Sequence, residues 1–272
     1  MTNAKTIGII AIKGGVGKTT TVANLGAALA VQGKKVLLID GNISSNGLGL
    51  HFGCMRPTAS VQDVLLGKRS MTSAIMTIDD YIDILPSVPV HQHVDMLRLR
   101  QCLAEVKHAY DVLLIDAPPT LNKELLGVML ASDDLFVVST PDYPTLYATM
   151  HASKIAKRRN MPIEGIILTH VRDKPFELTI EDIEKHTDIP ILAVMPYDQS
   201  VHEAIAHTKP VVSYCPQSHV AAAYLELAAC LIGEKFRDPR WLHRVKRFFF
   251  NETKKDYLNR KQYKKRSSIR KE

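Results

Sequence analysis

Short apolar runs alternate with helix-like segments through the first 233 residues of the chain. Runs typical of buried strands cover residues 7–12, 35–40, 111–116, 135–140, 163–169 and 189–195. Between them, apolar residues recur at three- and four-residue spacing over 19–32, 95–107, 145–159 and 180–186. Strands that alternate with helices need crossover connections, which favour a mostly parallel sheet flanked by helices on both faces. The pattern predicts an α/β protein whose ligand site lies beyond the carboxyl ends of the strands.

The pattern changes near the carboxyl end of the chain. A last body helix is expected over 217–232, with Gly233 as its carboxyl-terminal cap. Residues 235–272 hold 15 Lys and Arg against 4 Asp and Glu, whereas residues 1–234 hold 20 against 24. The net charge of +7 therefore combines a strongly basic tail with a mildly acidic body. We expect one domain over 1–233, large enough to bury a substantial core, and a basic amphipathic tail over 234–272.

Cysteine spacing argues against metal sites, and hydropathy argues against a membrane-spanning helix and a signal peptide. The four cysteines are scattered, without a CxxC pair or a histidine at ligand spacing, which argues against structural zinc and iron–sulfur sites. No segment approaches the roughly 20 apolar residues of a membrane-spanning helix. The amino terminus also lacks the apolar core of a signal peptide. We therefore expect a cytoplasmic protein, with any membrane contact made at the surface.

A glycine-rich segment joins the first predicted strand to the first predicted helix, with the sequence Lys-Gly-Gly-Val-Gly-Lys-Thr-Thr. Its glycines allow backbone N–H groups to surround a polyphosphate, and Lys18 and Thr19 stand where a phosphate lysine and a magnesium hydroxyl are needed. Lys13 is an additional lysine that the generic loop lacks. The expected nucleotide-binding residues of this loop are Lys13, Gly14, Gly15, Val16, Gly17, Lys18, Thr19 and Thr20.

Two aspartates end predicted strands that should lie beside this loop. Asp40 and Asp116 each follow a run of four apolar residues. Mg²⁺ keeps much of its hydration and uses few protein ligands, so a carboxylate at each strand end can hold magnesium-bound waters. We predict a Mg²⁺ site formed by Thr19, Asp40 and Asp116, with a turn or helix cap as the alternative use of each aspartate.

These motifs resemble those of the MinD/ParA group of deviant Walker-type ATPases. The resemblance rests on residues 13–20, on Asp116-Ala117-Pro118-Pro119 and on Met195-Pro196-Tyr197-Asp198, and it covers most of residues 5–233. It implies a P-loop NTPase fold, ATP and Mg²⁺ as cofactors, and a homodimer that forms on ATP binding and completes the catalytic site. It also implies that Lys13 reaches the partner's phosphates, where an ammonium offsets charge on the transferring phosphoryl group.

The resemblance also assigns roles to individual residues. The implied catalytic residues are Lys13, Lys18, Asp40, Asn42 and Asp116. The implied adenine-side residues are Thr169, Pro196, Tyr197 and Asp198.

The chain departs from the family pattern at three positions. Ile12 stands where the generic loop has glycine. Asn42 stands where many members have an aspartate that positions the attacking water; asparagine can orient water but cannot accept its proton. We therefore expect slow hydrolysis of ATP, which an activating protein partner would accelerate. Thr169 replaces a frequent adenine-contacting asparagine, and base selectivity stays open.

Apolar residues of the tail fall on one face of a predicted helix, with basic residues mostly at its sides and back. The predicted membrane-binding residues are Trp241, Leu242, Val245, Phe248 and Phe249. An aromatic face with a cationic collar is typical of a helix that binds an anionic membrane surface, and MinD-like family members carry such a helix. Three alternatives remain: the apolar face packs on the body, the tail is a disordered basic arm, or the tail binds DNA phosphates as in ParA-like members.

The glycine-rich loop and the basic tail together predict an ATP-hydrolysing dimerisation switch of MinD type. Such a switch would sit peripherally at the inner face of the cell membrane and position a cellular structure such as the division site. Two weak tails on one dimer bind together, which links nucleotide state to location. The alternatives are a ParA-type partition ATPase that binds DNA non-specifically and a regulatory nucleotide-binding module with very slow hydrolysis, for which Asn42 is the best support.

Overall fold

The structure is a computed structural model, and it describes residues 4–89, 92, 94–161 and 163–234. Within these residues one eight-stranded sheet has the order β3-β4-β2-β5-β1-β6-β7-β8. All neighbouring strands are parallel except the antiparallel pair β3 and β4. The strands are β1 (Lys5–Ile10), β2 (Val36–Asp40), β3 (Met76–Thr77), β4 (Ile82–Leu85), β5 (Val112–Asp116), β6 (Asp134–Ser139), β7 (Ile163–Val171) and β8 (Ile191–Pro196).

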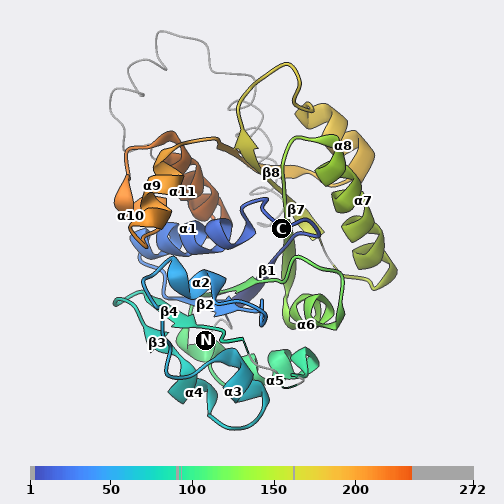
Figure 1. Ribbon diagram of the computed structural model, residues 1–272. Helices are drawn as coiled ribbons and strands as arrows, with labels where there is room; N and C mark the ends of the chain where they lie inside the picture. Colours follow the sequence, from blue (N-terminus) through green and yellow to red (C-terminus); the bar gives the residue numbers. More distant parts are fainter. Residues whose placement is uncertain (1–3, 90–91, 93, 162, 235–272) are drawn as a thin grey trace.

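Helices cover both faces of the sheet, which confirms the predicted fold class (Figure 1). One hydrophobic core joins the sheet to α1 (Lys18–Val31), α9 (Ser200–Ala206), α10 (Val211–Tyr214) and α11 (His219–Leu231). The second core joins it to α3 (Val61–Leu65), α4 (Met71–Ala74), α5 (Leu99–Ala104), α6 (Lys123–Ala131), α7 (Tyr143–Arg158) and α8 (Ile180–Thr187). A further short helix, α2 (Gly47–Leu50), follows β2.

Strand residues alternate between the two cores. In β2, Val36 and Leu38 belong to the core under α1 and α11, whereas Leu37 and Ile39 belong to the other core. All four side chains are fully buried. A strand covered on both faces needs apolar residues at every position, so its sequence is a continuous apolar run that is easily recognised.

The structure differs from the predicted elements over 95–107 and at β3 and β4, and it adds helices that were not predicted: α2, α3, α4, α6, α9 and α10. The helix predicted over 95–107 is instead η1 (Met96–Arg98) and α5, with η2 (Lys107–Ala109) after it. The Asp95 side chain accepts a 3.1 Å hydrogen bond from the Leu97 N–H, which caps a tight first turn. Strands β3 and β4 were not predicted. Asp83 interrupts the apolar run of β4, but it is buried and accepts a 2.8 Å hydrogen bond from the Tyr110 hydroxyl.

Parallel register brings together the strand ends that carry the predicted site. β5 lies between β1 and β2, and Asp40 is opposite Asp116 in the pairing of β2 with β5. The glycine-rich loop follows β1, and α1 begins at Lys18. Gly17 precedes it with φ 84°, a left-handed conformation that glycine adopts without a Cβ penalty.

The described chain ends just after α11. Gly233 has φ 76° and follows this helix, as expected of a glycine cap. In the part that the structure describes, no helix is long and apolar enough to cross a membrane. The predicted membrane-binding residues of the tail lie outside the described residues.

Candidate functional site

The loop between β1 and α1 has room for a ligand at its glycines. Gly14 and Gly15 are exposed, and a Cβ added to either would meet no atom within 4 Å. The first N–H groups of α1 lack partners inside the helix, as at every helix amino terminus. Loop and helix together therefore offer donors for a polyphosphate.

Lys18 and Thr19 both contact Asp116. The Lys18 Nζ lies 2.7 Å from Asp116 Oδ1, and the Thr19 hydroxyl donates to Oδ2 at 2.6 Å. Lys18 is 7% exposed and Asp116 is completely buried. Two charges withdrawn from water in this way stabilise each other, and removing either leaves an uncompensated charge. The predicted phosphate lysine, magnesium hydroxyl and strand-end carboxylate thus meet at one point.

Asp40 lies beside Asp116 and is also completely buried. The backbone N–H groups of Asn42 and Leu48 donate to its carboxylate at 3.1 and 3.2 Å. Burial raises the pKa of Asp40 to about 7, and the adjacent Asp116 carboxylate contributes to the rise. The carboxyl therefore titrates near neutral pH in the absence of a cation.

This arrangement fits Mg²⁺ chemically. A divalent cation would relieve the repulsion between Asp40 and Asp116, and the Thr19 hydroxyl is an oxygen ligand of the kind that Mg²⁺ uses. Within the described residues, no group of three His, Cys, Asp or Glu side chains could hold a metal by itself. The site thus suits an ion that takes its remaining ligands from phosphate and water.

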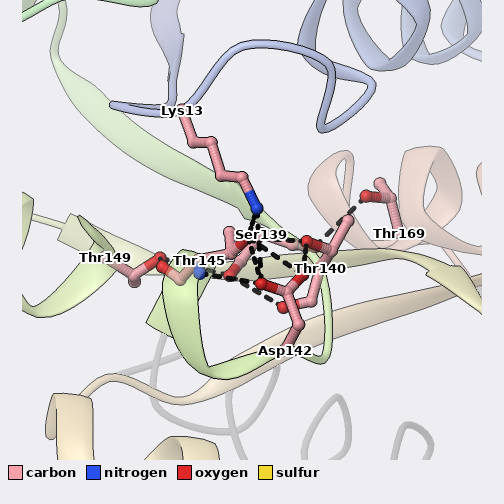
Figure 2. Close-up of polar contacts among 7 residues, drawn as sticks. All are labelled: Lys13, Ser139, Thr140, Asp142, Thr145, Thr149 and Thr169. Carbon is pink, nitrogen blue, oxygen red and sulfur yellow. Dashed lines mark hydrogen bonds and ion pairs between the residues drawn. The ribbon is translucent and has the colours of Figure 1, made fainter. Parts of the chain in front are cut away.

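Lys13 points toward Asp142 and Thr145, where α7 begins (Figure 2). Its Nζ donates to the Thr145 hydroxyl at 3.0 Å and to Asp142 Oδ1 at 3.4 Å. The side chains of Lys13 and Asp142 are 44% and 41% exposed. An ion pair this exposed contributes only about 0–1 kcal/mol. The second lysine of the loop is therefore held weakly, at the rim of the site.

Asn42 is bound within its own loop. Its side-chain Nδ2 donates to the Ser45 hydroxyl at 2.9 Å. Its backbone carbonyl accepts hydrogen bonds from the Ser87 hydroxyl at 3.2 Å and from the Ser45 N–H at 3.1 Å. The Asn42 amide is thus engaged within the loop that follows Asp40, and as an amide it cannot accept a proton.

We expect Asn42→Asp to raise ATP turnover by roughly tenfold or more, because a carboxylate can take the proton of an attacking water. Single-turnover phosphate release measures the rate. Asn122→Asp is a matched control: it makes the same chemical change at the exposed cap of α6, where aspartate caps as well as asparagine. Equal rates for Asn42→Asp and the unmodified chain would show that proton acceptance at this position does not limit hydrolysis.

A small cavity of about 30 Å³ borders the phosphate loop at Gly17 and Thr20. All four predicted adenine-side residues line it: Thr169, Pro196, Tyr197 and Asp198. Met195, the first residue of the Met195-Pro196-Tyr197-Asp198 motif, also lines it. Further lining residues that the sequence reasoning missed are His170, Val201, His202, Val220 and Tyr224. His170 lies in β7, directly after the strand predicted over 163–169, and this position was an available signal. His202 lies in α9, after the end of β8. Val220 and Tyr224 could not be recognised as site residues from the sequence, because their positions in α11 are typical of a buried core.

Thr169 lines this cavity, but its hydroxyl is used elsewhere. The hydroxyl lies 2.7 Å from the carbonyl oxygen of Val16 and 3.1 Å from that of Ser139, and it is the donor to both. Figure 2 shows Thr169 at the edge of the polar cluster that includes Ser139. Thr169 thus ties the phosphate loop to β6, and a single hydroxyl proton is not left for a base.

Known proteins match this chain over most of its length. A family model described as an AAA domain matches residues 4–161. The sporulation initiation inhibitor protein Soj of Bacillus subtilis is 32% identical over 247 residues, which cover 82% of this chain and 96% of Soj. The chain belongs to the MinD/ParA family of P-loop ATPases. A second model, described as 4Fe-4S iron sulfur cluster binding proteins of the NifH/frxC family, matches residues 127–246.

Solved structures agree with this membership of the MinD/ParA family. The septum site-determining protein MinD of Pyrococcus horikoshii, solved with Mg-ADP, has a TM-score of 0.79 and 32% identity, covering 84% of this chain and 96% of that one. An uncharacterized ATP-binding protein of Methanocaldococcus jannaschii is 34% identical over 233 residues, 85% of this chain and 88% of the relative. ATP and Mg²⁺ are the ligands typical of this family, and the cluster of Lys18, Thr19, Asp40 and Asp116 fits them.

Proposed function

We propose that this chain is an ATP-dependent dimerisation switch of MinD type that acts at a membrane surface. The observation that carries the proposal is the separation of two lysines in one loop. Lys18 is buried against Asp116, whereas Lys13 is exposed and held by weak contacts at the rim. One lysine is placed to serve its own nucleotide and the other is available to a second copy of the chain.

Within one chain, the loop N–H groups and Lys18 bind the phosphates. An ammonium has three donors, so Lys18 can keep its contact with Asp116 while it donates to a phosphate oxygen. Thr19, Asp40 and Asp116 would hold Mg²⁺, which when bound would neutralise charge on the phosphate oxygens. Asn42 orients water without accepting its proton, which keeps hydrolysis slow until a partner stimulates it.

Between two chains, Lys13 acts on the partner's phosphates. Lys13 can break its contacts with Asp142 and Thr145 at a small cost in free energy, because its ion pair with Asp142 is exposed. A triphosphate offers Lys13 much more negative charge than one carboxylate does. Two copies that exchange this lysine complete each other's sites, so ATP favours the homodimer and hydrolysis releases it.

The tail supplies the proposed membrane contact. The excess of basic residues and the aromatic face of the tail suit binding to an anionic lipid surface. The mildly acidic body carries the wrong charge for such binding. One tail binds weakly, and two on a dimer bind with avidity. We therefore place the dimer peripherally at the inner face of the cell membrane. The relatives named septum site-determining protein MinD support a role in positioning a structure such as the division site.

Co-sedimentation with anionic liposomes tests the membrane contact. We expect the full chain to bind liposomes with ATP and much less with ADP, and a chain that ends at Gly233 not to bind. A Trp241→Ser, Phe248→Ser double variant keeps every basic residue and loses about 3 kcal/mol or more of apolar burial. It should bind liposomes roughly a hundredfold more weakly if the apolar face enters the membrane.

A parallel series with duplex DNA tests the second candidate, a ParA-type partition ATPase. The similarity to Soj and the charge of the tail favour that candidate. DNA binding that needs ATP and the tail, survives the double variant and occurs without liposome binding would replace the MinD-type proposal. The third candidate, a regulatory module, rests on Asn42 and requires that phosphate release be negligible even at saturating ATP.

A further inference from the structure

Residues of α6, α7 and the end of β1 line an apolar groove of about 240 Å³. Its apolar lining includes Ile10, Ile12, Leu126, Met129, Ala152 and Ile155. Leu126 and Ile155 are only half-buried, and Leu121, which also lines the groove, is 48% exposed. The described part of the chain thus leaves apolar side chains uncovered between these two helices.

Two cations line the same groove. Lys123 lies in the first turn of α6, and Arg159 follows the last residue of α7. None of the described residues that line the groove is acidic, and within the described chain neither cation is paired with a carboxylate. The body over 1–234 is acidic on balance, so this groove is a local exception that attracts an anionic occupant.

These features fit an amphipathic helix with acidic residues beside its apolar face. Such helices bind grooves through apolar residues at i, i+3, i+4 and i+7. Small-molecule pockets typically enclose about 300–1,000 Å³, more than this groove offers. A fatty acid brings one carboxylate for two cations, whereas an acidic helix can bring one for each. The chain's own tail is strongly basic and would be repelled by Lys123 and Arg159.

The groove lies next to the second lysine of the phosphate loop. Ile12, which lines the groove, directly precedes Lys13. Lys13 in turn donates to the Thr145 hydroxyl at 3.0 Å, and Thr145 belongs to α7. A helix seated in the groove would therefore contact both the loop that carries Lys13 and the helix that holds it.

We propose that the groove between α6 and α7 is a docking site for an acidic amphipathic helix of another protein. The apolar side chains receive the apolar face of that helix, and Lys123 and Arg159 pair with its carboxylates. This surface goes beyond the proposed function, because binding there requires neither a nucleotide nor the tail.

Fluorescence anisotropy with two labelled synthetic peptides tests the proposal. Both peptides have leucines at i, i+3, i+4 and i+7; one carries glutamates at the flanking positions and the other carries lysines. We expect the full chain without nucleotide to bind the acidic peptide at least about tenfold more tightly than the basic one. Because the basic tail also attracts an acidic peptide, variants of the groove decide where the peptide binds.

Charge reversal in the groove is compared with charge reversal beside it. The Lys123→Glu, Arg159→Glu double variant should bind the acidic peptide about tenfold more weakly and the basic peptide more tightly. A damaged fold cannot explain a gain in affinity. The matched control is Lys154→Glu, Arg158→Glu, which changes the net charge equally at two exposed residues of α7 outside the groove. It should change either affinity by less than about threefold. Leu121→Gln should weaken both peptides about fivefold.

Four results would overturn the inference. Equal losses in the groove variant and its control would mean that only the net charge of the chain attracts the peptide. Groove-dependent binding of sodium oleate without binding of the acidic peptide would assign the groove to an acyl chain. A higher affinity for the acidic peptide in the Trp241→Ser, Phe248→Ser variant would make the tail the occupant. Self-association that Leu121→Gln abolishes, measured by light scattering without nucleotide, would make the occupant a second copy of the chain.

Discussion

Lys18→Ala is expected to abolish measurable ATP binding. The variant removes the ammonium that we propose binds the phosphates, and each charge-assisted hydrogen bond lost costs about 1.5–3 kcal/mol. Two such bonds correspond to a loss of affinity of roughly a hundredfold or more. Titration calorimetry with ATP and Mg²⁺ measures the effect. An affinity within about tenfold of the unmodified chain would contradict the assignment of Lys18 to the phosphates.

Fold damage must be separated from lost binding, because Lys18 is buried. Lys18→Ala leaves Asp116 without its cation, and breaking a buried pair from one side costs about 3–5 kcal/mol of stability. Asp116→Asn is the matched control, since it breaks the same 2.7 Å ion pair from the other side and keeps the lysine. We expect this variant to bind ATP with a weaker dependence on Mg²⁺. Thermal unfolding of both variants shows how much stability each has lost.

Lys13→Ala is expected to leave ATP binding intact while it removes ATP-dependent dimerisation and hydrolysis. The exposed contact with Asp142 contributes at most about 1 kcal/mol, so the fold and the phosphate site of the same chain should hardly change. A cation supplied in trans to a transferring phosphoryl group accelerates the reaction by roughly 10³-fold or more. Light scattering with ATP and with ADP measures dimerisation, and phosphate release measures turnover.

A mixing experiment tests whether Lys13 acts across the dimer. The Asp116→Asn chain is expected to bind magnesium poorly, and it keeps Lys13. Mixed with Lys13→Ala, it should restore part of the turnover, because the lysine of one chain then serves the nucleotide of the other. Lys154→Ala, a change of an exposed lysine on α7, serves as the surface control. Normal turnover by Lys13→Ala alone would exclude the trans role of this lysine.

Much of the fold could be predicted because parallel strands buried on both faces are continuous apolar runs. β2 and β5 were recognised in this way, and the helix predicted over 19–32 from its apolar spacing is α1, Lys18–Val31. β4 could not be recognised in this way, because Asp83 interrupts its apolar run. In the structure the Asp83 carboxylate accepts a hydrogen bond from the Tyr110 hydroxyl. That partner comes from a segment 27 residues away, beyond the reach of any local pattern.

The candidate site likewise combines features that the local sequence predicts with features that depend on tertiary contacts. The sequence by itself determined the phosphate loop with its two lysines, because glycine flexibility and residue spacing are local properties of a short segment. It also placed an aspartate at each of two strand ends. Only the tertiary structure decided that Asp40 lies beside Asp116, that Lys18 is buried while Lys13 lies at the rim, and that the Thr169 hydroxyl is engaged with the loop. Those outcomes depend on strand order and on contacts between distant segments, which residue spacing along the chain does not determine.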